Sequence, residues 1–257
     1  MAFMMRPDVV DFREFYGSRL GQVARLFIRK RIREIWPNVT GFNVLGLGYA
    51  TPFLSQFREE AARVVALMPA TQGVTRWPAS HPGLAALADE QELPLPDASI
   101  DRVLLVHALE NSEMVRPLLR EIWRVLASGG RLLVVVPNRS GIWARVERTP
   151  FGHGRPYSQG QLSRLLRDTM FQPTQHASAL HVPPINSRLL LRTAGVWEKL
   201  GERYGAAVAG VLLIEADKQI YGVTPVAAPA RCRPMPVVVS SGRGLVTRGR
   251  DSGSERS

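Results

Sequence analysis

The sequence predicts an α/β fold in which helices cover both faces of an open, mostly parallel and doubly wound sheet. Three observations predict it, and all fall within residues 93–138. RVLLVH and RLLVVVP are short, unbroken apolar runs, as expected of strands that are buried on both faces. Between them, apolar residues recur at helical spacing, and Gly129 and Gly130 are expected to end that helix. The order strand, helix, strand forms the crossover that joins two parallel strands.

Residues 11–36 are predicted to form a single amphipathic helix before the sheet. Apolar residues from Phe12 to Ile35 form one stripe, and most of the arginines lie off it. Asp11 is a candidate N-cap, and Pro37 ends the helix. Because the following domain can cover the apolar stripe, packing on the sheet is preferred to the alternative, a helix lying on a membrane surface.

The other segments alternate between strands and helices, which favours a parallel sheet. Further strands are predicted at 41–48, 63–69, 84–88, 174–180 and 210–222. Helices are predicted at 51–61, at 158–170 with Ser158 as its cap, and at 186–204. Residues 138–156 form an insertion rich in glycine, proline and aromatic residues, and a stretch rich in proline, arginine, serine and glycine follows residue 222.

The composition indicates a globular domain with appendages. The chain has 257 residues, of which 45% are hydrophobic, so it can bury a sizeable core. We expect an N-terminal helix at 1–37, one α/β domain at 38–222 and a disordered basic tail at 223–257. The single cysteine, Cys232, excludes an internal disulfide, and no apolar run matches a transmembrane span or a signal peptide. A cytoplasmic location is therefore expected.

The net charge of +11 comes almost entirely from arginine. A basic surface favours nucleic acid or an anionic membrane as a partner. The sequence contains no zinc-ligand spacing and no RNA-binding signature. A solvated basic surface is therefore the preferred interpretation, and nucleic-acid binding is an alternative.

The loop after the first strand is the first candidate binding site. Gly46, Leu47, Gly48, Tyr49 and Ala50 follow a strand and precede a helix. Glycine lets the backbone approach a ligand closely, and N–H groups at the start of a helix can bind an anion. Open α/β sheets bind ligands at the carboxyl ends of their strands, where this loop lies.

The wording of two stretches resembles a known family. LPLPDASIDRVLLVHALE and RVLASGGRLLVVVPN resemble the second half of class I S-adenosylmethionine-dependent methyltransferases. VLGLGYATPFL and TPFGHGRPYS look like an uncharacterised bacterial group of methyltransferase-like proteins. The resemblance covers residues 42–222. It implies a Rossmann-like sheet of seven strands, with an antiparallel last strand inserted beside the fifth, and S-adenosylmethionine as cofactor.

The resemblance also implies where the cofactor would bind. The glycine loop would hold the carboxylate of its methionine moiety, although Gly46 replaces the family's acid and Ala50 its second glycine. Met68 stands where the family places an acid for the ribose, and a lost hydrogen bond to a charged acceptor costs about 1.5–3 kcal/mol. The adenine would contact Asp89 and Glu90. The methionine end would lie at His107, Ala108 and Leu109.

Methyl transfer from a sulfonium is an in-line displacement, so the protein mainly aligns the acceptor and excludes water. A general base is optional, and the candidates are His107, His153 and Tyr157. The insertion that carries His153 and Tyr157 is a candidate lid or substrate wall. Further polar candidates near the same edge are Tyr16, Glu110 and Asn138.

Four functions are compatible with these patterns. The first is a methyltransferase acting on a small-molecule, lipid or macromolecular acceptor. The second is a catalytically inactive methyltransferase-like module for binding or regulation, favoured by the missing acids at Gly46 and Met68. A nicotinamide dinucleotide enzyme is the third, but the third glycine and the ribose acid are absent. A nucleic-acid binder is the fourth. The sequence indicates neither the acceptor nor the oligomeric state.

Overall fold

The computed structural model describes residues 7–79, 83–185 and 209–219. The helix predicted at 186–204, the tail predicted from 223 and Cys232 lie outside these residues. Among the described helices, none is long and apolar enough to cross a membrane.

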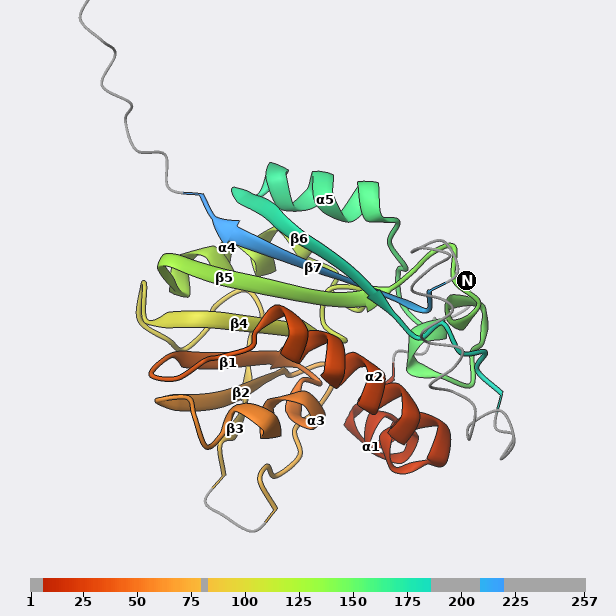
Figure 1. Ribbon diagram of the computed structural model, residues 1–257. Helices are drawn as coiled ribbons and strands as arrows, with labels where there is room; N and C mark the ends of the chain where they lie inside the picture. The colour runs from red at the N-terminus through yellow and green to blue at the C-terminus, as the bar shows by residue number, and fades with distance from the viewer. Residues whose placement is uncertain (1–6, 80–82, 186–208, 220–257) are drawn as a thin grey trace, which may run out of the picture. The chain divides into compact units, whose positions relative to one another are not determined.

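The described residues form one seven-stranded sheet in the order β3-β2-β1-β4-β5-β7-β6 (Figure 1). β1 to β5 pair in parallel, and β7 is antiparallel to both β5 and β6. This confirms the predicted sheet and the insertion of the last strand beside the fifth. The strands are β1 Asn43–Gly48, β2 Arg63–Pro69, β3 Ala85–Ala88, β4 Ile100–Val106, β5 Leu126–Pro137, β6 Phe171–Ala179 and β7 Val211–Lys218.

Helices cover both faces of the sheet, as predicted. α1, α2 and α3 contribute to one buried apolar cluster, and α4 and α5 contribute to the other. In Figure 1, α2 crosses the near face of the sheet over β1, and α4 lies behind β5. The helices are α1 Val9–Gly17, α2 Arg19–Ile35, α3 Thr51–Leu54, α4 Val115–Val125 and α5 Gln159–Asp168, with 3-10 turns η1 Ser55–Phe57, η2 Trp143–Arg145 and η3 Pro150–Gly152.

The prediction of one N-terminal helix was wrong, because the helix is interrupted at Ser18. Ser18 has an extended backbone and ends α1, and its side chain accepts a hydrogen bond from the Gly21 N–H to cap α2. A Cβ at Gly21 would collide with the carbonyl group of Phe15, so this glycine lets the two helices meet closely. Asp8, not Asp11, is the N-cap of α1, and Asp11 completes its capping box.

Two other predicted boundaries also differ. The helix predicted at 51–61 is only four residues of α-helix followed by one 3-10 turn. α4 ends at Val125, before Gly129 and Gly130, which lie in the first part of β5. The pairing of β5 with β4 shifts register between Leu126 and Arg131. The two glycines therefore accommodate an irregularity in the strand, with Gly129 at φ +75°, rather than a helix end.

A buried carboxylate connects β7 to the C-terminal end of α2. Glu215 of β7 is 2% exposed and accepts a hydrogen bond of 2.8 Å from the indole N–H of Trp36. Arg131 of β5 pairs with the same carboxylate at 3.2 Å. A buried charge needs such partners, since removing one leaves the other uncompensated.

Candidate active site

The strand order reverses between β1 and β4. β2 and β3 lie on one side of β1, and β4 and the later strands lie on the other. In open α/β sheets, ligands bind at the carboxyl ends of the strands at such a switch point. Here these ends are Gly48 of β1 and Val106 of β4, which pair with each other.

The two strand ends approach each other closely at Gly48. Its φ is +79°, and a Cβ there would collide with the carbonyl oxygen of Val106 and lie 2.8 Å from the Cβ of Ala108. The glycine was expected to let the backbone approach a ligand. In this structure the close contact is with the backbone of β4, which leaves no room for a side chain, and the approach to a ligand stays a prediction.

Aromatic side chains from α1 cover this switch point. The ring of Phe12 stacks on Tyr49 with centroids 5.0 Å apart and lies 4.7 Å from the His107 ring. Tyr16 stacks on Tyr49 at 5.8 Å. Phe12, Tyr16, Tyr49 and His107 are each at most 5% exposed, so the end of the sheet is closed by the protein's own side chains.

A hydrogen-bonded chain runs from α1 into the loop after β4. The hydroxyl of Tyr16 lies 2.7 Å from Nε2 of His107, and Nδ1 of His107 lies 3.0 Å from Oε1 of Glu110. Burial, followed by the charges of Glu110 and Tyr49, raises the pKa of Tyr16 well above its usual value. The hydroxyl therefore keeps its proton and can donate to Nε2, which places the ring proton on Nδ1, facing the carboxylate. This order of groups resembles a hydroxyl–histidine–carboxylate triad.

Two hydrogen-bond acceptor atoms next to the Tyr16–His107–Glu110 series have no partner among the described residues. They are Oε2 of Glu110 and Oδ1 of Asn111, and both residues are buried. Gly154 packs against Asn111 and the backbone of Glu110, since a Cβ there would lie 2.5 Å from the Glu110 carbonyl oxygen and 2.9 Å from Oδ1 of Asn111. An unpaired buried acceptor costs about 1–3 kcal/mol, so the closed arrangement does not satisfy every polar group of the site.

A cavity of about 250 Å³ lies beside the switch point, at the ends of β2 and β3. Pro69, Ala70 and Thr71 line one side, and Asp89 and Glu90 line the other. The Asp89 carboxylate accepts a hydrogen bond from the backbone N–H of Gln91 at 2.8 Å, and Glu90 accepts one from the hydroxyl of Ser112 at 2.6 Å. Met68 does not line this cavity; its side chain is buried in the apolar cluster beneath α1 and α2.

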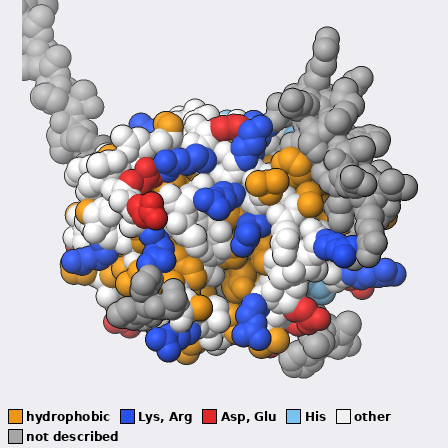
Figure 2. All heavy atoms as spheres, turned by 60° about the horizontal axis from the view of Figure 1, so that its bottom comes forward, with side chains coloured by type: hydrophobic (Ala, Val, Ile, Leu, Met, Phe, Trp, Pro, Cys, Tyr) orange, Lys and Arg blue, Asp and Glu red, His pale blue; other side chains and the backbone are white. Residues whose placement is uncertain are grey.

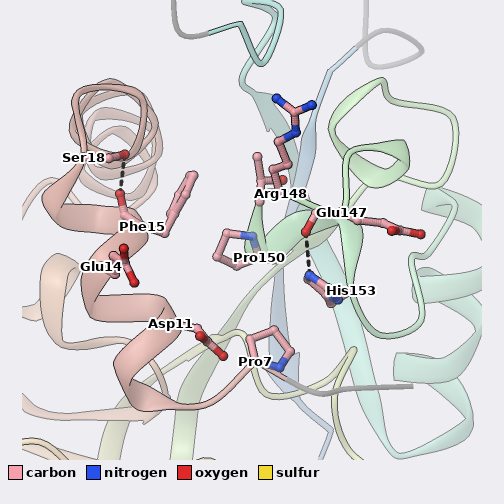
Figure 3. A pocket seen from close by; sticks show the side chains of 10 residues that line it. Pro7, Asp11, Glu14, Phe15, Ser18, Glu147, Arg148, Pro150 and His153 are labelled. Atoms are coloured by element: carbon pink, nitrogen blue, oxygen red, sulfur yellow. Dashed lines mark hydrogen bonds between the residues drawn. The ribbon is translucent and has the colours of Figure 1, made fainter. Parts of the chain in front are cut away.

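A second cavity, of about 400 Å³, lies between α1 and the insertion after β5 (Figure 3). Asp11, Glu14 and Phe15 line it from α1, and Pro150 and His153 line the opposite wall. The Nε2 atom of His153 lies 2.7 Å from the Glu147 carbonyl oxygen, so its imidazole is held within the insertion.

Phe151 lies between this cavity and the switch point. Its ring is 6.0 Å from that of Phe15 and 5.0 Å from that of His107. Tyr157 is half-buried, and burial, followed by the charge of Glu110, raises its pKa. The Asn138 side chain donates to the carbonyl of Ala209 at 2.8 Å, which gives it a structural contact at the end of β5.

Comparison with known proteins agrees with this geometry. Residues 44–134, from β1 to β5, match a family model described as a methyltransferase domain. These residues are thus similar to a methyltransferase domain, as the resemblance to class I S-adenosylmethionine-dependent methyltransferases implies. A protein of Mycobacterium tuberculosis named as a probable S-adenosylmethionine-dependent methyltransferase is 30% identical over 158 residues, or 59% of this chain and 56% of that protein.

Two further similarities support the family and the fold. A demethylmenaquinone methyltransferase of Deinococcus radiodurans is 40% identical over 70 residues, or 26% of this chain and 29% of that protein. A solved S-adenosylmethionine-dependent methyltransferase from Thermotoga maritima is 16% identical, with a TM-score of 0.60, and the match covers 82% of this chain and 96% of that one. The matches span 29% of the Deinococcus protein and 56% of the Mycobacterium protein, so the chain covers at most a little more than half of either curated relative.

The site fits the family's cofactor at one end and not at the other. The cavity beside Asp89 and Glu90 offers carboxylates and a wall of small residues to a nucleoside. At the switch point, Phe12 and Tyr16 cover Tyr49 and His107, where the methionine end of the cofactor was expected to bind. The nucleoside end of the cofactor thus has fitting residues in this structure, and the methionine end is covered by α1.

The structure therefore groups the candidate residues differently from the sequence. Of the three candidate bases, His107 lies at the switch point, whereas His153 lies in the outer cavity and Tyr157 packs against the apolar cluster on the other face. Leu47, Ala50, Ala108 and Leu109 are buried core residues. Sequence reasoning missed Phe12 as a site residue, and its only signal was a place in the apolar stripe of the first helix.

Proposed function

We propose that this chain is an S-adenosylmethionine-dependent methyltransferase whose methyl acceptor is unidentified. The observation that carries the proposal is the family match from β1 to β5, which includes the glycine loop, Asp89, Glu90 and His107. When bound, the cofactor supplies an activated methyl group. In this proposal Asp89 and Glu90 hold its nucleoside end in the cavity beside β2 and β3.

The other residues of the site would serve the acceptor. His107, oriented by Glu110, is the group placed to take a proton from the methyl acceptor. Its Nε2 atom becomes free to do so once the Tyr16 hydroxyl moves away. The insertion wall of the cavity at Pro150 and His153 is the proposed acceptor site, because Phe151 lies next to it and its ring is 5.0 Å from that of His107. Phe151 would also exclude water from this histidine.

A second function, an inactive methyltransferase-like binding module, is favoured by one observation. Phe12, Tyr16 and Tyr49 fill the switch point, where a ligand would otherwise lie. Nucleic-acid binding has weaker support, since on the face shown in Figure 2 the basic side chains lie apart from one another, between apolar and uncharged groups. We also propose a cytoplasmic location and a functional unit made of the 38–222 domain with its preceding helices.

Calorimetric titration of the whole chain with S-adenosylhomocysteine tests the proposal. We expect saturable binding, and Asp89→Asn should weaken it about tenfold, because a charged acceptor is lost while the amide oxygen can still accept from the Gln91 N–H. Glu92→Gln is the matched control, since Glu92 follows in the same loop but does not line the cavity. Absence of binding at millimolar ligand would overturn the proposal and favour the binding module.

A further inference from the structure

α1 is attached to the end of the sheet at three separate points. The backbone N–H of Val9 donates to the carbonyl of Gln72, in the loop after β2, at 2.8 Å. Phe12 is fully buried between the rings of Tyr49 and His107. The Tyr16 hydroxyl contacts His107 at 2.7 Å. These contacts hold a helix of nine residues over the point where the strand order reverses.

The position of α1 and the binding of a ligand at the switch point exclude each other. Ligands of open α/β sheets occupy the crevice outside the carboxyl ends of the strands at this point. In this chain, the rings of Phe12 and Tyr16 lie against Tyr49 and His107, the residues that follow the ends of β1 and β4. A ligand that extends from the cavity beside Asp89 toward His107 therefore has to displace these two side chains.

The joint between α1 and α2 offers a place for that movement. Ser18 is extended between the two helices, with φ −70° and ψ 161°. Gly17, just before it, has no atom within 4 Å of the position of a Cβ. Hinges are often a few residues at the ends of helices that absorb a change in backbone angles. Gly17 and Ser18 are therefore the candidate hinge, and a movement of α1 there has to open the close contact between Gly21 and Phe15.

The unpaired acceptors indicate that the closed state is not the only state the site is built for. Oε2 of Glu110 and Oδ1 of Asn111 are buried without partners next to His107. A ligand with an ammonium or hydroxyl group at this place would supply the missing donors. This observation is independent of the aromatic contacts, and it also points to a ligand at the covered end.

We propose that α1 is an intramolecular competitor for the cofactor site: Phe12 and Tyr16 cover the switch point in the closed chain, and an S-adenosyl ligand occupies it only after α1 has turned away about Gly17 and Ser18. The inference rests on the proposed function. The apparent affinity then equals the intrinsic affinity multiplied by the fraction of chains that are open. Weakening the attachment of α1 should therefore tighten binding, although it removes contacts from the protein.

Two variants and a control test this with S-adenosylhomocysteine as the probe. Tyr16→Phe removes the hydrogen bond to His107 and should tighten binding about threefold to tenfold. Phe12→Leu, which loses the ring stack but keeps an apolar side chain, should also tighten it. Val10→Ala is the control, because Val10 lies on the exposed side of the same helix and should leave the affinity unchanged.

Amide hydrogen exchange of the wild-type chain gives a second measurement that does not depend on any variant folding well. Saturating ligand should speed exchange in residues 9–17, whereas ligands usually slow exchange where they bind. Tighter binding by the variants, or binding by the variants alone, supports the inference. Slower exchange in α1 on binding, or weaker binding by Tyr16→Phe and Phe12→Leu, overturns the inference and leaves the proposed function in place. Absence of binding by every variant overturns both.

Discussion

The contact between Gly48 and β4 can be tested by comparing two glycines that share one backbone conformation. Gly48 and Gly41 both have φ +79°, but only Gly48 has neighbours where a Cβ would be placed. Alanine at a positive φ costs about 1–2 kcal/mol, and this cost applies to both positions. At Gly48 the collision with the Val106 carbonyl adds about 1–3 kcal/mol, as overpacking does elsewhere.

We therefore expect Gly41→Ala to lose about 1–2 kcal/mol of unfolding free energy and Gly48→Ala to lose about 2–5 kcal/mol. Urea denaturation followed by far-ultraviolet circular dichroism measures both values, provided that the slope with urea stays the same. Equal losses would show that β1 and β4 are not as close at Gly48 as the structure has them. In that case the glycine would be free to serve a ligand, as the sequence predicts.

Three further outcomes are expected. Glu215→Ala should lose about 3–5 kcal/mol of unfolding free energy, measured in urea, because the indole N–H of Trp36 stays buried without its carboxylate; Glu215→Gln, which keeps an acceptor, should lose clearly less. Ser158→Ala should cost about 1 kcal/mol in the same assay, since Ser158 caps α5, and no change would exclude this role. Burial, followed by the charge of Arg167, lowers the pKa of His176, so the unfolded chain binds a proton near pH 6.5 before the folded chain does. Stability should therefore fall slightly as the pH drops below about 6.5, since the exposed position of His176 screens the effect, and His176→Gln should remove that part of the slope in thermal melts at several pH values.

The parallel core of the sheet could be predicted from sequence because its strands are buried on both faces. A strand such as RVVALMP then reads as an unbroken apolar run, and β2 occupies the predicted residues 63–69. The order of the strands followed from the resemblance rather than from the pattern. The break at Ser18 could not be predicted, since the apolar stripe continues through it with the same helical period.

The site was harder to predict because its contacts are far apart in the sequence. Tyr16 and His107 are separated by 91 positions, and no local pattern indicates that a side chain of the first helix meets the end of the fourth strand. The glycine loop is a second case in which the sequence does not identify the contact partner. Its composition predicts that something comes close to Gly48, but the partner, the backbone of β4, is determined only by the packing of the sheet.

The place of β7 has a consequence for how the chain is made. β7 joins β5 and β6, and both of these precede it in the chain. During synthesis, β5 therefore has an unpaired edge until residues 211–218 emerge, and β6 has no neighbour among the described strands. Exposed edges of this kind favour aggregation, and such long-range pairing is slow. A nascent chain halted before residue 211 would thus carry an open, apolar sheet edge that invites chaperone binding or degradation.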